Sequence, residues 1–366
     1  MVDLPTRCVP KKNDEFLSEK QRVDYETHRR NFIEWLMVFG KSPDSIEGYS
    51  EDTVYKTAYR CGAFDRWVWN REDGYTMPLT HDHADAYLRD MAYDDYSGSH
   101  MANTKDSLKR YFKWRHHKFG EEKWEPELTI SKDTNVQPPD FLSVDERKRI
   151  RQAALDYGAI PAYDNLSPEQ RSRWKMYVSK RLRKPLEDVV PADWNQVNGW
   201  KYTSMVWTSL DTGLRPAEVG RARVSWVDVD NQMLRIPVED STKNADNWPV
   251  SISERTADAL ERWISERKTY ALYDDTDALW LTREGNPYGT NSLRRLLHKL
   301  CDIAEIDIET RKMSWYTIRH SVGTYMTREE DLAAAKAQLR HKSVQTTTKY
   351  DAAPVEDRRD ALDRMG

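Results

Sequence analysis

LRHKSVQTTTKY, at residues 339–350, has a basic pair, Arg340 and His341, directly after its first residue and ends on Tyr350. Three segments upstream are also built around basic residues: TGLRPAEVGR with Arg215, STKNADNWPV with Lys243, and YTIRHS with Arg319 and His320. Arginine, lysine and histidine side chains that converge can surround a phosphate that carries extra negative charge. A tyrosine beside them can act as a nucleophile. We therefore expect residues that are far apart in the chain to form one phosphate-handling site.

Each of these residues, taken singly, also has an ordinary structural explanation. Arg215 stands before a proline at an expected helix start, where arginines are usually surface residues. Lys243 lies in an expected turn, where lysines are usually solvated. A tyrosine near the end of the sequence, such as Tyr350, more often serves in packing. The order and spacing of the segments, rather than any one residue, favour the functional interpretation.

Length and composition predict a globular chain of two domains. The chain has 366 residues, of which 38% are hydrophobic and 32% charged, enough for two apolar cores. Its 14 tryptophans and 19 tyrosines argue against disorder. No stretch approaches the roughly 20 apolar residues that span a bilayer, and the first residues lack the apolar core of a secretory signal. We therefore expect no membrane partner and a cytoplasmic protein.

The cysteines and the net charge limit the classes of site. Cys8, Cys61 and Cys301 are far apart and lack Cys-x-x-Cys spacing, so the sequence supports neither a zinc site nor a disulfide framework. The net charge of −4 does not favour binding to nucleic acid. A mildly acidic chain can still bind DNA when its basic residues converge on one face.

The N-terminal part of the chain predicts a small all-helical domain. Residues 1–25 are polar and are expected to form a loose arm. In the following domain, at residues 26–120, apolar side chains recur with the period of a helix, beginning with Phe32, Trp35 and Leu36. Four helices are expected, and no strand.

The last of these helices, at about residues 102–118, is strongly basic. Its candidate DNA-binding residues are Lys105, Lys109, Arg110, Lys113 and Arg115. A run of charges is commonly a solvated face, but here Asp106 is almost the sole acidic residue within the run. Both interpretations, a solvated face and a DNA-facing one, stay open on the sequence alone.

The remainder of the chain predicts a mixed α+β domain. Residues 121–141 form the expected linker, in which Pro138-Pro139 excludes a helix. Ser143 and Glu146 make a capping box that begins the second domain, at residues 142–352. Its expected strands are VSWVDVD, MLRIPV and WPVSIS, with helices before and after them, a polar insertion at about residues 158–195 and a tail at 353–366. The fold class is therefore mainly α with a small antiparallel sheet.

The basic segments suit attack on a phosphodiester. Arg215 and Arg319 can each hold two phosphate oxygens through a planar guanidinium. Lys243, at the expected hairpin tip, can protonate the leaving oxygen, and His341 can donate to the phosphate or assist proton transfer. The surrounding cations are expected to favour the phenolate of Tyr350, so no cofactor is expected.

Together these segments resemble the tyrosine recombinase family, which includes phage integrases and Xer-like strand-exchange enzymes. The resemblance covers about residues 28–352 and rests on TGLRPAEVGR, the hairpin lysine, YTIRHSVGTYM and LRHKSVQTTTKY. It implies an all-helical, SAM-like core-binding domain followed by a catalytic domain. The residues that it implies around the scissile phosphate are Arg215, Lys243, Tyr316, Arg319 and His341, with Tyr350 as nucleophile and Glu218 and His320 as support.

Two positions depart from the family pattern. Tyr316 stands where a histidine is usual; its hydroxyl can donate a hydrogen bond but cannot be cationic at neutral pH, and activity is expected to be retained. Arg340 replaces a glycine before His341. Because residues with a side chain disfavour positive φ, we expect either an altered local turn or an added DNA phosphate contact from Arg340.

The resemblance implies a site-specific recombinase that cleaves and rejoins DNA through a 3′-phosphotyrosine, in integration, excision or dimer resolution. Its implied partners are double-stranded recombination sites, three further copies of the chain in a tetramer on DNA, and accessory DNA-bending proteins. The tail is expected to dock on a neighbouring protomer. Two alternatives stay open: a type I topoisomerase-like enzyme with the same chemistry, and a non-catalytic DNA-binding protein on the same fold.

Overall fold

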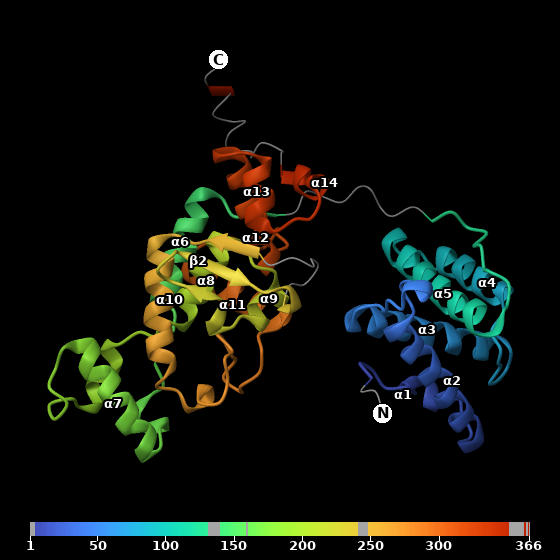
Figure 1. Cartoon of the computed structure of the whole chain (residues 1–366), viewed down its shortest axis with the longest axis horizontal. Helices are drawn as coiled ribbons and strands as arrows, with labels where there is room; N and C mark the ends of the chain where they lie inside the picture. Colours follow the sequence, from blue (N-terminus) through green and yellow to red (C-terminus); the bar gives the residue numbers. More distant parts are fainter. Residues whose placement is uncertain are drawn as a thin grey trace. The chain divides into compact units, whose positions relative to one another are not determined.

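The chain folds into two compact units, Met1–Gln137 and Pro138–Gly366 (Figure 1). The structure is a computed structural model that describes residues 4–130, 140–158, 160–240, 248–350, 362–363 and 365. Each unit has its own buried apolar cluster. Among the described residues, no helix is long and apolar enough to cross a bilayer.

The first unit is built from helices within the part of it that the structure describes. They are α1 (Lys11–Asp14), α2 (Glu19–Val38), α3 (Glu51–Arg71), α4 (His81–Tyr93) and α5 (Gly98–Phe119), with a 3₁₀ turn at Pro43–Ser45. The helical period of the sequence gives the inward face, on which Phe32, Leu36, Phe64 and Leu108 are fully buried or nearly so. The prediction of an all-helical segment is confirmed.

The N-terminus corrects the expectation of a loose arm at residues 1–25. Helix α1 and the first turns of α2 lie within it. Asn13 is buried, and its amide donates hydrogen bonds to Tyr25 Oη (2.9 Å) and to the carbonyl of Gly62 (3.0 Å). Tyr25 in turn donates to the buried carboxylate of Asp65. Some of the polar residues that suggested an arm therefore form an internal hydrogen-bond network.

The expected linker at 121–141 is also partly structural. Trp124 is buried against the first unit's core, and its Nε1 donates to Asp85 Oδ2 at 3.1 Å. The backbone nitrogen of Glu127 donates to the other oxygen of the same carboxylate, also at 3.1 Å. The chain after α5 therefore folds back onto the first unit. The Pro138-Pro139 pair lies outside the described residues.

The second unit surrounds a small antiparallel sheet with helices. Its longer helices are α6 (Val144–Asp156), α7 (Pro168–Leu182), α8 (Lys201–Thr212), α10 (Glu254–Arg267), α11 (Thr290–Ile303), α12 (Trp315–Glu329) and α13 (Leu332–Leu339). The short ones are α9 (Pro216–Arg221) and α14 (Val344–Thr347). The strands are β1 (Val227–Asp228), β2 (Met233–Ile236) and β3 (Trp248–Ser251), in the order β1-β2-β3. The predicted fold class is confirmed.

The sheet supplies one wall of the second core. Leu234 of β2 pairs with Val250 of β3, and both side chains are buried with Leu210 of α8 and Trp263 of α10. Gln338 of α13 donates from Nε2 to the carbonyl of Ser251 at 2.7 Å, so α13 is tied to the end of β3. The sheet thus connects α8 and α13, the two helices that lead into the basic segments.

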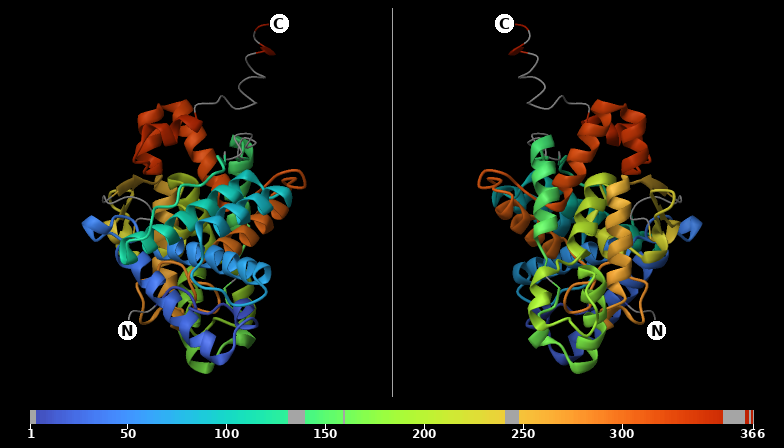
Figure 2. Two further views of the ribbon diagram at one scale, coloured as in Figure 1. Left: turned by 90° about the vertical axis from the view of Figure 1, so that its right-hand side faces the viewer. Right: turned by 90° about the vertical axis from the view of Figure 1, so that its left-hand side faces the viewer.

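The insertion at 158–195 forms a satellite lobe around α7. Trp174 is buried in a small apolar cluster separate from the main core. Its ring packs edge-on against that of Tyr270, with the ring centroids 4.6 Å apart. Arg173 pairs with Asp274, which fixes the lobe to the chain after α10. Both side views place α7 at the opposite end of the second unit from α13 (Figure 2).

Candidate active site

Tyr350 is held in a buried position by α12 and α13. It ends the 3₁₀ turn Thr348–Tyr350, is 4% exposed, and packs with Val322 and Leu339. Gly323 makes this approach to α12 feasible: a Cβ there would lie 2.8 Å from the Tyr350 ring. A side chain at position 323 would therefore displace Tyr350 from its seat.

The hydroxyl of Tyr350 lies beside two neighbouring residues of α12. His320 Nδ1 is 3.2 Å from Tyr350 Oη. Arg319 also makes a side-chain hydrogen bond to Tyr350 and is itself 3% exposed. Its guanidinium donates to the carbonyls of Gly213 and Leu339, which end α8 and α13. The second arginine therefore joins three segments at the predicted nucleophile.

Gly213 turns the chain from α8 into the first basic segment. Its φ of +60° is in the left-handed region, which glycine adopts without steric cost. A Cβ at this position would lie 2.6 Å from Leu339 Cδ2. Gly213 thus allows both the turn and the close contact with α13, and Arg215 follows directly at the start of α9.

Arg215 is held by Glu218, as the family resemblance implies. Arg215 Nη1 donates to Glu218 Oε1 at 2.8 Å, and its backbone nitrogen donates to Glu218 Oε2 at 2.7 Å. The carboxylate is fully buried. Burial pushes its pKa up, but the guanidinium groups of Arg340 and Arg215 outweigh burial and hold the pKa of Glu218 below its usual value.

Arg340 corrects both expectations for its position. It adopts the left-handed conformation itself (φ 55°, ψ 53°) and ends α13, so the turn is formed without glycine. Its side chain is 1% exposed, and Nη2 donates to Glu218 Oε2 at 2.6 Å. A guanidinium in this position does not face an external DNA phosphate. It is a second partner for the carboxylate that holds Arg215.

His341 lies against the face of the Tyr350 ring. The two rings are nearly parallel, with an interplanar angle of 7° and centroids 5.9 Å apart. His341 is 4% exposed, and its Nδ1 lies 3.0 Å from Thr347 Oγ1. Thr347 therefore fixes the orientation of the imidazole at the start of the turn that carries Tyr350.

Two other predicted site residues are placed differently. Tyr316 is 43% exposed on the first turn of α12, and its ring centroid lies 6.4 Å from that of His320. It therefore opens to solvent at the rim of the cluster. Lys243 lies outside the described residues, between β2 and β3. Its catalytic role stays a prediction.

Burial reverses the expected acidity of the nucleophile. We expected the surrounding cations to favour phenolate. Burial instead raises the pKa of Tyr350 above its ordinary value of 10, although Arg319 and Arg215 partly offset the rise. The pKa of Arg319 falls to about 9, because burial and the charges of Arg215 and Arg340 disfavour another cation. The site is thus rich in positive charge while its phenol stays protonated at neutral pH.

His320 is the residue whose importance sequence reasoning underestimated. It was assigned to support, yet its imidazole reaches the hydroxyl of Tyr350. Helical spacing carried the signal: residues 316 and 320 are four apart and share one face of α12. Because Tyr316 occupies the position where the family usually has a site histidine, His320 on the same face of the helix was a candidate for contact with the nucleophile.

The candidate DNA-binding residues of α5 are mostly engaged within the first unit. Lys113 donates to the carbonyls of Gly40 and Lys41, both at 3.0 Å. Arg110 lies 4.9 Å from the Tyr49 ring centroid. Their acidic partners lie beyond the end of the helix. Arg115 pairs with Glu121, and Lys109 pairs with Glu125 at 3.6 Å. The half-buried Lys105 has no hydrogen bond or ion pair among the described residues.

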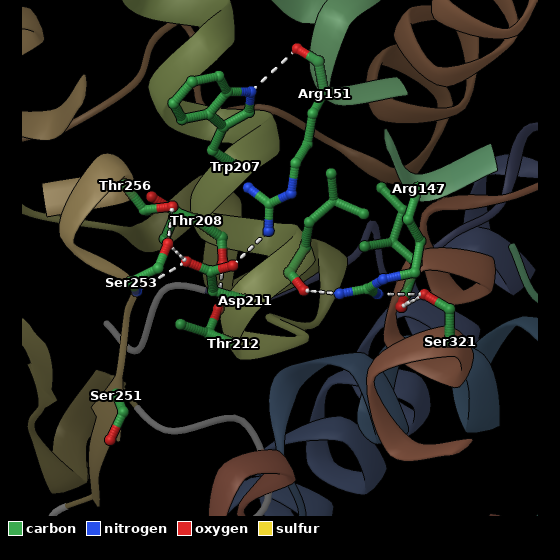
Figure 3. A network of polar contacts seen from close by, with 12 residues as sticks. Arg147, Arg151, Trp207, Thr208, Asp211, Thr212, Ser251, Ser253, Thr256 and Ser321 are labelled. Atoms are coloured by element: carbon green, nitrogen blue, oxygen red, sulfur yellow. Dashed lines mark hydrogen bonds and ion pairs between the residues drawn. The ribbon is translucent and has the colours of Figure 1, made fainter. Parts of the chain in front are cut away.

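A polar network behind the site fixes the helices that carry it (Figure 3). Arg147 of α6 donates to Ser321 Oγ of α12 at 2.7 Å and to the carbonyl of Leu210 of α8 at 2.8 Å. Next to it, Arg151 of α6 pairs with Asp211 of α8. Because Ser321 follows His320 directly, this network sets the rotation of α12 about its axis.

Known proteins resemble part of this chain in sequence. Residues 186–356 match the model of the phage integrase family. The tyrosine recombinase XerC of Corynebacterium efficiens is 26% identical over 140 residues, 38% of this chain and 42% of that protein. XerC of Syntrophus aciditrophicus is 23% identical over 221 residues, 59% of this chain and 66% of that protein. The chain spans about half the length of the curated relatives it matches.

Solved structures share the fold at low sequence identity. The XerH site-specific recombinase bound to difH substrate in a pre-cleavage complex has a TM-score of 0.55 and 14% identity, covering 96% of this chain and 86% of that one. The Tn1549 transposon integrase in complex with transposon right end DNA has a TM-score of 0.55 and 14% identity, covering 92% and 98%. Residues 186–356 are therefore similar to the phage integrase family, and the fold resembles that of the XerH and Tn1549 enzymes.

Proposed function

We propose that this chain is a site-specific DNA recombinase in which Tyr350 attacks a backbone phosphate and forms a 3′-phosphotyrosine. The observation that carries the proposal is the placement of the Tyr350 hydroxyl beside Arg319 and His320, with Arg215 next to Arg319. The arginines near the buried phenol carry more positive charge than the single negative charge of a phenolate could neutralise. A phosphate is the natural counter-charge.

The two arginines supply the charge stabilisation that attack on a phosphodiester needs. Negative charge on the non-bridging oxygens grows as the Tyr350 oxygen approaches phosphorus, and fixed guanidinium groups offset it. Arg215 is oriented by Glu218, and Arg319 by the carbonyls of Gly213 and Leu339. Because these donors are already in place, they need little reorganisation during the reaction. Loss of either guanidinium should slow cleavage by about 10²–10³-fold.

Rejoining follows from the same chemistry in reverse. The phosphotyrosine bond conserves the energy of the broken phosphodiester, so a 5′ hydroxyl of another strand can attack it without a nucleotide cofactor. In this proposal Lys243 acts as the general acid for the leaving 5′ oxygen. Tyr316, exposed at the rim, offers its hydroxyl to a phosphate oxygen or to an adjacent strand.

The partners proposed for the chain are double-stranded recombination sites and further copies of itself. Support comes from two proteins that share the fold: XerH, bound to difH substrate, and the Tn1549 integrase, in complex with transposon right end DNA. A tetramer on two DNA sites, aided by DNA-bending proteins, would bring the strands to be exchanged together. The tail at 353–366 lies largely outside the described residues, and its docking on a neighbouring protomer belongs to the same proposal.

Covalent capture on DNA tests the proposal. The probe is a pool of nicked duplexes with a randomised central segment, in which the short strand released by cleavage diffuses away. We expect a protease-sensitive protein–DNA adduct with the wild type and none with Tyr350→Phe. Tyr93→Phe, a matched change at a tyrosine that is 90% exposed in the first unit, should keep the adduct. No adduct with the wild type, or an undiminished one with Tyr350→Phe, would overturn the proposal.

The captured DNA also separates the recombinase from the topoisomerase alternative. A recombinase should yield adducts that share a sequence, and two duplexes with that sequence should exchange strands. Relaxation of any supercoiled plasmid, with adducts that share no sequence, would instead identify a topoisomerase-like enzyme.

A further inference from the structure

We propose that His320 is the general base of the reaction, the group that takes the proton from the hydroxyl of Tyr350 as it attacks the phosphate. This inference rests on the proposed function. It gives a catalytic role to a residue that the family resemblance treats as support. It also explains how the chain can act with Tyr316 at the position where the family usually has a histidine.

The need for a base follows from the burial of the nucleophile. Tyr350 is 4% exposed, so bulk water has little access to its hydroxyl. Burial raises its pKa despite the nearby arginines, so the attacking oxygen carries a proton at neutral pH. A phenol is a poor nucleophile until that proton leaves, and a positioned side chain must therefore accept it.

The geometry places an imidazole nitrogen at the hydroxyl. His320 Nδ1 lies 3.2 Å from Tyr350 Oη, which is the upper end of the range for proton transfer through a hydrogen bond. The rings are tilted by 48° with centroids 5.7 Å apart, so the imidazole meets the phenol at an angle rather than face to face. In the reactive tautomer Nδ1 is unprotonated and Nε2 carries the hydrogen.

The other groups near the hydroxyl are less suited to accept its proton. His341 lies parallel to the Tyr350 ring, and its Nδ1 contacts Thr347 Oγ1. Arg319 donates to two carbonyls and remains a donor. Tyr316 is itself a phenol, whose neutral oxygen is a weak base. Within the part of the chain that the structure describes, the charged and titratable groups facing the His320–Tyr350 pair include Tyr316 and Arg319 on α12, His341 before α14, and Arg215 at the start of α9.

The proposed step balances in atoms and charge. The O–H bond of Tyr350 breaks as the proton moves to His320 Nδ1, and the Oη–P bond forms. The bond between phosphorus and the 5′ oxygen breaks, and that oxygen takes a proton from a separate general acid, proposed above as Lys243. When a 5′ hydroxyl attacks the phosphotyrosine, its proton returns to the deprotonated general acid and its oxygen bonds to phosphorus. The Oη–P bond breaks, and the leaving Tyr350 oxygen recovers its proton from His320.

The test compares single-turnover cleavage rates across pH with a DNA selected from the nicked pool by the wild type. The wild-type rate should rise as an imidazole loses its proton, near pH 6.5 for an ordinary histidine, and then level off. His320→Asn keeps a hydrogen-bond acceptor near Nδ1 but cannot take the proton. We expect it to lower the plateau rate by about 10²–10⁴-fold and to remove the inflection.

A second substrate separates a base from an acid. A sulfur atom in place of the 5′ bridging oxygen leaves readily without a proton, so it bypasses the general acid. The His320→Asn defect should persist on this substrate, whereas a defect in leaving-group protonation should disappear. Added imidazole should also partly restore cleavage by His320→Ala, which a merely structural role would not allow.

A matched histidine serves as the control for folding. His298 lies on α11, where its Nε2 is 3.0 Å from the carbonyl of Met313. His298→Gln should keep the inflection of the rate, whatever its effect on stability. If the wild type forms the adduct while His320→Asn keeps both rate and inflection, or is restored by the sulfur substrate, His320 is not the base. If the wild type forms no adduct at all, the proposed function itself fails.

Discussion

Asp211 and Glu218 are buried carboxylates in the same stretch of chain, yet their surroundings differ in charge. Asp211 pairs with one guanidinium, that of Arg151, and accepts from neutral donors on Ser253, the backbone nitrogen at 2.9 Å and Oγ at 2.7 Å. Glu218 accepts from two guanidinium groups, Arg215 at 2.8 Å and Arg340 at 2.6 Å. The Arg151–Asp211 pair is balanced, with one guanidinium to one carboxylate, whereas at Glu218 two guanidinium groups share one carboxylate.

The imbalance marks the site and the balance marks the scaffold. At Asp211, burial raises the pKa, but Arg151 and the hydrogen bonds outweigh it, and the ion pair joins α6 to α8 (Figure 3). Near Glu218, Arg319 adds a third guanidinium. The pKa of Arg319 falls to about 9 because it is buried and lies close to the positive charges of Arg215 and Arg340. A phosphate bound there would relieve that repulsion. The gathering of several guanidinium groups beside Tyr350 therefore points to function, whereas the Arg151–Asp211 pair points to structure.

The largest effect on stability is expected from Glu218→Gln. The change keeps the shape of the side chain but removes the buried negative charge with which Arg215 and Arg340 pair. Removing one partner of a buried ion pair typically costs about 3–5 kcal/mol. Urea denaturation of the full chain measures this loss.

A double variant tells charge imbalance from loss of packing. Adding Arg340→Met to Glu218→Gln removes one of the two cations that paired with the carboxylate, so part of the lost stability should return. Strictly additive losses would contradict an electrostatic origin.

A smaller loss is expected from changes at Arg340 alone. Arg340→Met should destabilise the chain by about 2 kcal/mol, because Glu218 loses one charged hydrogen bond but keeps Arg215. Arg340→Gly should be less destabilising by about 1 kcal/mol, since glycine adopts the φ of 55° without strain. Thermal and urea unfolding of the two variants measure both numbers. Equal stability of the two would show that the left-handed turn costs arginine nothing.

The sequence predicted the parts of this site that depend on local pattern. Arg215, Arg319, His341 and Tyr350 were identified from short segments, and the structure brings all four together. The mainly helical fold followed from periodicity in the same way, because a helix places residues three and four apart on one face.

What sequence reasoning missed depends on partners that are distant in the chain. Arg340 was expected to alter the local turn or to contact a DNA phosphate, because nothing near it in sequence reveals Glu218, 122 residues earlier. The basic face of α5 looked unbalanced because Glu121 and Glu125 lie beyond the helix and fold back onto it. Asn13 looked like part of an arm because its partners, Tyr25 and Gly62, lie in α2 and α3. Charges and amides acquire their roles only once tertiary contacts are formed.

Asp211→Asn should cost less than the changes at Glu218, about 1.5 kcal/mol at pH 7, because neutral donors remain for the amide oxygen. The pKa of Asp211 is lower in the folded chain than its usual 3.8. Its charge therefore stabilises the fold fully above that pH, and the contribution is lost as the pH falls through the lower folded-state value. The difference in unfolding free energy between wild type and Asp211→Asn should stay constant from pH 7 to about 5 and shrink toward pH 3. A difference that grows on acidification would contradict this assignment.

The smallest effect is expected from Ser253→Ala, at the other side of the balanced cluster. The hydroxyl of Ser253 donates to Asp211 Oδ2 at 2.7 Å, but the backbone nitrogen of the same residue donates to that oxygen as well and would remain. The loss of one neutral donor to a carboxylate should cost about 1 kcal/mol, seen as a modest fall in the urea midpoint without a change in slope. Because Arg151 still balances the charge of Asp211, DNA cleavage should be unchanged. If Ser253→Ala instead reduced DNA cleavage by more than its loss of stability explains, the Asp211 and Glu218 clusters would act as one functional unit. That outcome would contradict the division between scaffold and site.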